Sequence, residues 1–119
     1  MKRLFIILLL LLCGCSAPVY AGYAEVINPT TCNITASENN TQYSLSIPDG
    51  VRILSFNSRD GSPFRYAFAS GKVAGSVNPY MTCSANVTVK FEGILTENVT
   101  LYVASPTNSN TVEVLYWGP

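Results

Sequence analysis

The chain has 119 residues, 48% of them hydrophobic and 12% charged, with seven Lys and Arg against seven Asp and Glu. This length allows one domain, and the balanced charge excludes nucleic-acid binding driven by phosphate neutralisation. The sequence contains no His, which removes Ser-His and Cys-His dyads, His-ligated zinc and a histidine pH switch.

The first residues have the features of a secretory signal peptide. Lys2 and Arg3 precede an unbroken apolar run over residues 4–12. Val19 and Ala21 occupy the two positions that signal peptidase reads when it cuts before Gly22. This pattern predicts a signal peptide over residues 1–21 and a single β domain over residues 22–119.

A second cleavage position is open. The run Leu12-Cys13-Gly14-Cys15-Ser16 resembles the lipobox of bacterial lipoproteins, and the resemblance implies that residues 1–14 are removed and Cys15 is lipidated. Either cut predicts an exported protein, in the periplasm, at the outer membrane as a lipoprotein, or outside the cell. A membrane is expected to be involved only through such a lipid anchor.

Two cysteines, Cys32 and Cys83, stay in the mature chain after either cut. An even pair behind an export signal predicts one disulfide. A bond between them would stabilise a domain of this small size.

Alternating apolar and polar residues predict strands along most of the mature chain. No segment shows a helical period, and turn residues separate seven or eight short strands. We therefore expect an all-β fold, an antiparallel β-sandwich of immunoglobulin-like type or a small barrel. The near-copies Asn86-Val87-Thr88-Val89 and Asn98-Val99-Thr100-Leu101 predict neighbouring strands of an antiparallel meander. The apolar positions are Cys32, Ile34, Ala36, Tyr43, Leu45, Ile47, Phe64, Tyr66, Phe68, Ala85, Val87, Val89, Phe91, Val99, Leu101, Val103, Val112, Val114 and Tyr116.

The alternation fails over residues 70–81, where only Val73 and Val77 are expected to be anchored. Irregular segments of this length in compact domains are functional or poorly ordered. This segment is therefore a candidate binding loop, with Lys72, Asn78 and Tyr80 as contact residues. The alternative is a crossover between the two sheets of a sandwich.

Two aromatic residues are candidates for exposed contacts. Tyr102 is expected on the outer face of its strand, and alternation places Trp117 and Tyr116 on opposite faces. A structural role for this pair is the alternative.

Four asparagines stand in N-glycosylation sequons, at Asn33, Asn39, Asn86 and Asn98. They are expected to face outward and to carry glycans if the source is eukaryotic. In a bacterial protein they are polar surface residues.

Three short motifs are similar to the loops of chagasin-like cysteine-peptidase inhibitors, which share an immunoglobulin-like sandwich. They are Asn28-Pro29-Thr30-Thr31, the stretch from Gly71 to Gly75, and Tyr116-Trp117-Gly118-Pro119, in the family's order. The family has Gly where this chain has Cys32. The resemblance implies an inhibitor-like module as a minor alternative.

No constellation predicts catalysis, a metal site or a cofactor. Asp49 and Asp60 each precede Gly in a turn and are explained there, and no phosphate loop or Ca²⁺ loop is present. We expect a non-enzymatic exported binding or surface domain with a protein or glycan partner. The alternative is a structural subunit of a pilus, surface coat or secretion apparatus that self-associates through edge strands.

Overall fold

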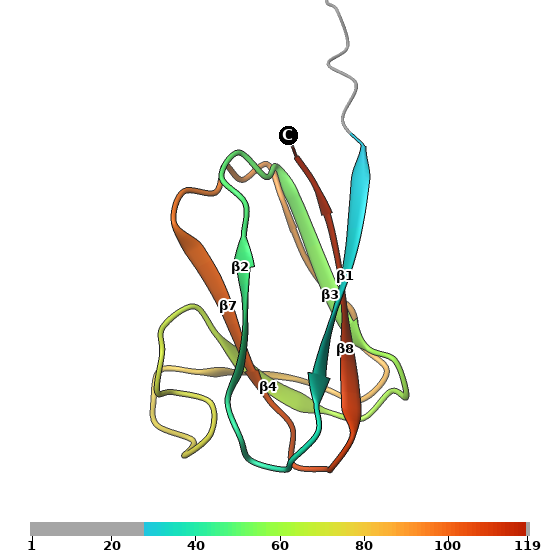
Figure 1. Ribbon diagram of the computed structural model, residues 1–119, viewed down its shortest axis with the longest axis vertical. Helices are drawn as coiled ribbons and strands as arrows, with labels where there is room; N and C mark the ends of the chain where they lie inside the picture. The colour runs from blue at the N-terminus through green and yellow to red at the C-terminus, as the bar shows by residue number, and fades with distance from the viewer. Residues whose placement is uncertain (1–27, 119) are drawn as a thin grey trace, which may run out of the picture.

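The computed structural model describes residues 28–118, so the predicted signal peptide and Cys15 lie outside the described residues. Eight strands make up the regular structure of this part (Figure 1). Residues 28–118 contain no helix long and apolar enough to span a bilayer. The strands are β1 (Pro29–Ala36), β2 (Tyr43–Ile47), β3 (Ile53–Ser58), β4 (Phe64–Ala67), β5 (Met81–Cys83), β6 (Val89–Glu92), β7 (Val99–Ala104) and β8 (Asn110–Trp117).

The strands form two antiparallel four-stranded sheets, with the orders β1-β8-β3-β6 and β2-β7-β4-β5. The all-β, two-sheet expectation is therefore confirmed. The pairs β1 with β8, β2 with β7, β3 with β6 and β4 with β5 are nested, as in a long hairpin wound upon itself. This is the strand order of a jelly roll.

The predicted meander is wrong. The near-copy segments around Val89 and Val99 lie in different sheets, because β6 pairs with β3 while β7 pairs with β2 and β4. Alternation fixes which side chains point inward, but it does not fix which strand becomes the neighbour. The connection over residues 93–98 is long enough to cross from one sheet to the other.

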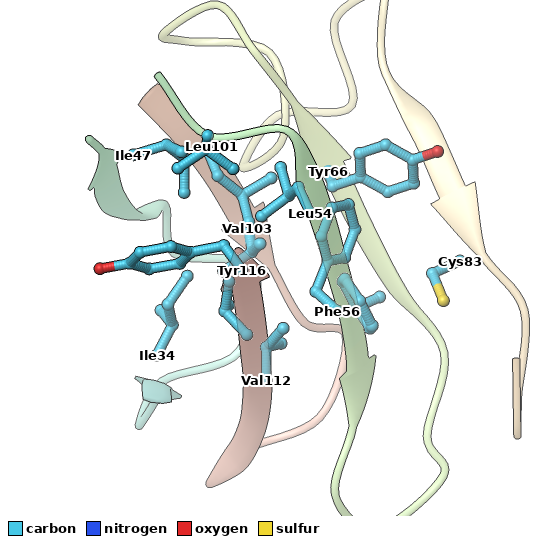
Figure 2. Close-up of a cluster of buried hydrophobic side chains, with 13 residues drawn as sticks. Ile34, Ile47, Leu54, Phe56, Tyr66, Cys83, Leu101, Val103, Val112 and Tyr116 are labelled. Atoms are coloured by element: carbon cyan, nitrogen blue, oxygen red, sulfur yellow. The ribbon is translucent and has the colours of Figure 1, made fainter. Parts of the chain in front are cut away.

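The core lies between the sheets and is built from the inward-facing residues of the alternating pattern (Figure 2). Phe56, Leu101, Val103 and Val112 have no exposed surface. Phe56 and Tyr66 meet edge to face, with ring centroids 5.0 Å apart. Such aromatic pairs add about 0.5–1.5 kcal/mol beyond the burial of their area.

One predicted strand begins later than the pattern suggested. Val87 is 46% exposed, and Asn86 has a left-handed backbone with φ 58°. The Asn86 N–H donates to Gly61 O at 3.0 Å and so joins a turn contact. The alternation at Ala85 and Val87 therefore belongs to a turn, while β5 forms just before it.

The predicted disulfide is wrong: Cys32 and Cys83 are both free thiols. Cys32 lies on β1, at one edge of its sheet, and Cys83 lies on β5, at the far edge of the other sheet. Three strand spacings amount to about 14 Å, and the sheets are stacked about 10 Å apart. A disulfide needs Cα atoms within roughly 7 Å. Figure 2 shows Cys83 across the core from Ile34, a neighbour of Cys32 on β1.

Thr96 ties the connection between β6 and β7 to the turn between β2 and β3. This residue is 6% exposed. Its hydroxyl donates to Pro48 O at 2.6 Å and accepts from Val51 N at 2.9 Å. Its backbone donates to Val51 O at 3.1 Å and accepts from Gly50 N at 2.8 Å.

Replacing Thr96 with Val should therefore be costly. The substitution keeps the shape but leaves the buried Val51 N–H without its acceptor, which costs about 1–3 kcal/mol of unfolding free energy. Urea denaturation measures the loss. Thr35→Val, at an exposed position of β1, is the matched control and should stay within about 0.5 kcal/mol of wild type. Equal stability of the two variants would contradict this role.

The two thiols should differ in reactivity. Cys83 is 2% exposed, whereas Cys32 is partly exposed, and burial raises the pKa of the Cys83 thiol. Because thiolates react with maleimides and thiols do not, the native protein should be labelled at Cys32 and become labelled at Cys83 only on unfolding. Peptide mapping by mass spectrometry reads both sites. If both cysteines stayed unlabelled until a reductant was added, the result would support the Cys32–Cys83 disulfide and contradict the free thiols.

Candidate functional site: an apolar groove between two sheet edges

Exposed apolar side chains gather in one segment of the described chain. The large ones are Leu95 (74% exposed), Met81 (60%), Val77 (51%), Phe68 (46%) and Val87 (46%). All of them lie between residues 68 and 95, the segment that contains β5 and β6. Because contiguous exposed apolar patches are typical of interaction surfaces, this segment is the candidate functional site.

Two adjoining hollows of about 290 and 490 Å³ form an apolar groove in this segment. Phe68 and Phe91 line both hollows and meet edge to face, with ring centroids 5.8 Å apart. The smaller hollow is also lined by Leu54, Ile94, Leu95, Thr96, Asn98 and Val99. The larger one is also lined by Tyr66, Ala67, Ala69, Pro79, Tyr80 and Met81.

The groove lies between two strands that end their sheets. Phe91 belongs to β6, the last strand beyond β3, and Met81 belongs to β5, the last strand beyond β4. Within residues 28–118, neither strand has a partner on its outer side. Their outward N–H and C=O groups are therefore available to pair with another strand.

The groove offers apolar contact and backbone hydrogen bonds. None of its lining residues carries a charge, and its titratable side chains are Tyr66 and Tyr80. Burial, with a smaller effect of Cys83, raises the pKa of Tyr66 above its ordinary value of 10.0, so this phenol stays protonated at neutral pH. Such walls suit an apolar chain better than an anion.

Of the three contact residues predicted in the loop, Tyr80 lines the groove, together with its neighbours Pro79 and Met81. Lys72 and Asn78 instead close the loop on itself, because Lys72 Nζ donates to Asn78 O at 3.4 Å. Val73 has no exposed surface, but Val77 is exposed, so only one of the two expected anchors is confirmed. The crossover interpretation is also wrong, because β4 and β5 are neighbours in one sheet.

The loop instead covers the outer face of the β2-β7-β4-β5 sheet. Val73 packs there with Ala67 and Ala104 in a small second core. Arg65 fixes the loop, since its Nε donates to Val73 O at 2.6 Å while its Nη2 donates to Asn40 Oδ1 at 2.7 Å.

The two predicted aromatic contacts lie away from the groove. Tyr102 is partly buried against the small second core. Tyr116 is 9% exposed within the main core, whereas Trp117 is partly exposed, so the two residues point to opposite faces as predicted.

All four sequon asparagines are exposed, as expected for outward-facing positions: Asn33, Asn39, Asn86 and Asn98. Their glycosylation stays a prediction. Two of the three inhibitor-like motifs, however, are not loops. Pro29 and Trp117 are opposite each other in the β1–β8 ladder, so these segments cannot insert into a peptidase as free loops.

The central groove residues were missed because alternation assigns them to the core. Phe68, directly after β4, and Phe91 on β6 continue the inward pattern but lie where the sandwich is open. Leu95 could have been predicted as an exposed contact residue, since it is a large apolar residue within a turn segment.

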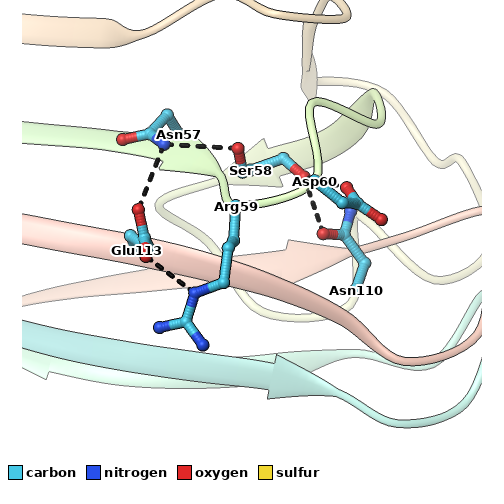
Figure 3. Close-up of polar contacts among 6 residues, drawn as sticks. All are labelled: Asn57, Ser58, Arg59, Asp60, Asn110 and Glu113. Atoms are coloured by element: carbon cyan, nitrogen blue, oxygen red, sulfur yellow. Dashed lines mark hydrogen bonds and ion pairs between the residues drawn. The ribbon is translucent and has the colours of Figure 1, made fainter.

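A separate hollow, outside the groove, lies on the outer face of the β1-β8-β3-β6 sheet. Its polar side chains form hydrogen bonds with one another (Figure 3). Arg59 Nε donates to Glu113 Oε1 at 2.7 Å, and Asn57 Nδ2 donates to Glu113 Oε2 at 3.5 Å. Beside it, Ser58 Oγ donates to Asn110 Oδ1 at 2.7 Å, and Asn110 has no exposed surface. These contacts stabilise the sheet and leave few groups for a ligand.

Comparison with known proteins assigns no family. No family model and no curated protein matches the chain. Similar solved structures include a de novo designed double-stranded β-helix determined by solution NMR, with 10% identity, a TM-score of 0.45, and coverage of 76% of this chain and 97% of that one. Another is described as "Bacillus endospore appendages form a novel family of disulfide-linked pili", with 14% identity, a TM-score of 0.42, and coverage of 78% and 87%.

The Arg59–Glu113 contact predicts a pH-dependent contribution to stability. The hydrogen bond from Arg59 is the main cause that lowers the pKa of Glu113 below its ordinary 4.5. The contribution is therefore present above about pH 4.5 and lost as the pH falls through the lowered folded value. Glu113→Gln should lower the melting temperature at pH 7, and its difference from wild type should shrink toward about pH 2. A pH-independent difference would contradict this role.

Proposed function

We propose that this protein is a non-enzymatic exported domain that binds an extended apolar segment of a protein partner in the groove between β5 and β6. One observation carries the proposal: three of the five exposed large apolar side chains, Phe68, Met81 and Leu95, line an uncharged groove that is bordered by two unpaired strand edges. Apolar contact and edge pairing together are the recognition mode of β-strand addition.

The division of the groove into two adjoining hollows suits this mode. In an extended segment, side chains on one face repeat every two residues, about 6.6 Å apart. Two such side chains would enter the two hollows on either side of Phe68 and Phe91. The backbone of the segment would meanwhile pair with β5 or β6.

A protein partner fits the groove better than a glycan. Sugar rings need several polar groups for their hydroxyls, and the polar side chains of the smaller hollow are Thr96 and Asn98. The Thr96 hydroxyl already serves Pro48 and Val51. The larger hollow adds only the phenols of Tyr66 and Tyr80.

A second candidate function is a structural subunit that assembles through its edge strands. The edge strands on the opposite side of the domain, β1 and β2, favour it. β1 is an edge strand of eight residues without a charge, and β2, at the edge of the other sheet, is also uncharged. Natural edge strands are usually short or charged, because long neutral edges pair with other chains. An edge of this kind suits repeated head-to-tail assembly.

Site-specific photo-cross-linking distinguishes the two functions. A benzophenone amino acid is placed in the full chain at Leu95 in the groove, at Thr35 on β1, or at Pro106 as an exposed background control. The chain is expressed in its source organism and irradiated. A discrete adduct at Leu95 that is absent at Pro106 is expected, with mass spectrometry identifying the partner.

The outcomes separate cleanly. Adducts at Thr35 alone, in multiples of the mass of the chain, would support the structural-subunit function and overturn the groove. Equal adducts at all three positions, or none at Leu95, would also refute the proposed binding site.

A further inference from the structure

The outer edge strand of the groove carries two opposite charges on one face. Lys90 and Glu92 are exposed and form an ion pair with each other on the outer face of β6. Their neighbours across the sheet, Ser55 and Ile53 of β3, are uncharged. The other side of β6 is unpaired in the described part of the chain.

The charges of Lys90 and Glu92 are complementary to those of a second β6 strand when the two strands are antiparallel. If β6 pairs antiparallel with β6 of a second copy about a two-fold axis through Phe91, Lys90 of each copy lies opposite Glu92 of the other. Residues directly opposite in an antiparallel pair are close enough for ion pairing. A parallel in-register pair would instead set Lys90 against Lys90, which is unfavourable.

The same register matches the apolar face. Phe91 of one copy lies opposite Phe91 of the other on the inner side, and the two grooves open toward each other. Phe68, Met81 and Leu95, all at least 46% exposed in one copy, border the joined space. A two-fold contact of this kind is isologous, so every favourable contact occurs twice.

We infer that the partner at the edge of the groove is a second copy of this chain, with β6 paired antiparallel to its counterpart about Phe91, so that two four-stranded sheets become one continuous sheet. The inference rests on the proposed function and names its partner. β1 and β2 are less suited as the pairing strand, because neither carries a charge to meet Lys90 and Glu92.

Charge reversal tests this register. In the purified processed protein, Lys90→Glu sets Glu against Glu92 twice per dimer, and Glu92→Lys sets Lys against Lys90 twice. Each should raise the dimer dissociation constant by about tenfold or more, as expected for two reversed cross-strand pairs. The double variant K90E/E92K restores both pairs and should dimerise as wild type does. Sedimentation equilibrium measures the wild type and the three variants.

Mixing the two single variants provides the matched control for the ion pair inside each strand. Both single variants lose that internal pair, so a purely structural effect would persist in the mixture. In the proposed register, however, the two acidic side chains of the K90E copy lie opposite the two basic side chains of the E92K copy. The mixture should therefore form heterodimers with near wild-type affinity by native mass spectrometry. Thermal unfolding of each variant confirms that the fold is intact.

A wild-type protein that stays monomeric at millimolar concentration, or single variants that dimerise normally, would overturn the inference. Photo-cross-linking at Leu95 to a different protein would then leave the proposed binding function standing. Absence of any Leu95 adduct would remove both.

Discussion

The antiparallel pairing of β1 with β8 holds the two ends of the domain together along eight residue pairs, from Pro29 opposite Trp117 to Ala36 opposite Asn110. β8 also pairs with β3 on its other side, so the last strand lies inside its sheet. The sheet, and the core that it covers, cannot be completed before β8 is in place. Because these contacts are far apart in sequence, closing them costs loop entropy that only the finished core offsets.

The nested topology also decides what kind of surface each edge presents. β1 and β2 are uncharged edges, whereas β5 and β6 border an apolar groove and β6 carries both signs of charge. Cores of sandwiches are sealed where both sheets are fully overlaid, but here the space beside Phe91 stays open. Both proposed functions therefore use sheet edges, which is where this sandwich leaves backbone groups and apolar side chains uncovered.

No disulfide between Cys32 and Cys83 contributes to the stability of this domain. Thr96 and Asn110 are buried polar side chains whose hydrogen bonds join separate segments of the chain. Buried polar groups of this kind add specificity, because any alternative packing leaves them unsatisfied. They fix the connections over the ends of the core, while the alternating apolar residues fill its middle.

The sequence by itself determined the strand content and the inward faces. Alternation placed Ile34, Leu101 and Val114 in the core correctly, because side-chain direction in a strand has a period of two and depends only on local order. Turn chemistry likewise placed Asp49 correctly in a turn before Gly50. These features need no knowledge of distant residues.

Only the tertiary structure decided the neighbours. Strand order separated Cys32 from Cys83 and placed the near-copies around Val89 and Val99 in different sheets. It also left Phe68 and Phe91 at an open edge, although their pattern is that of core residues. Pairing depends on which strands meet across long loops, and that choice is settled by the packing of the whole core, which no local periodicity encodes.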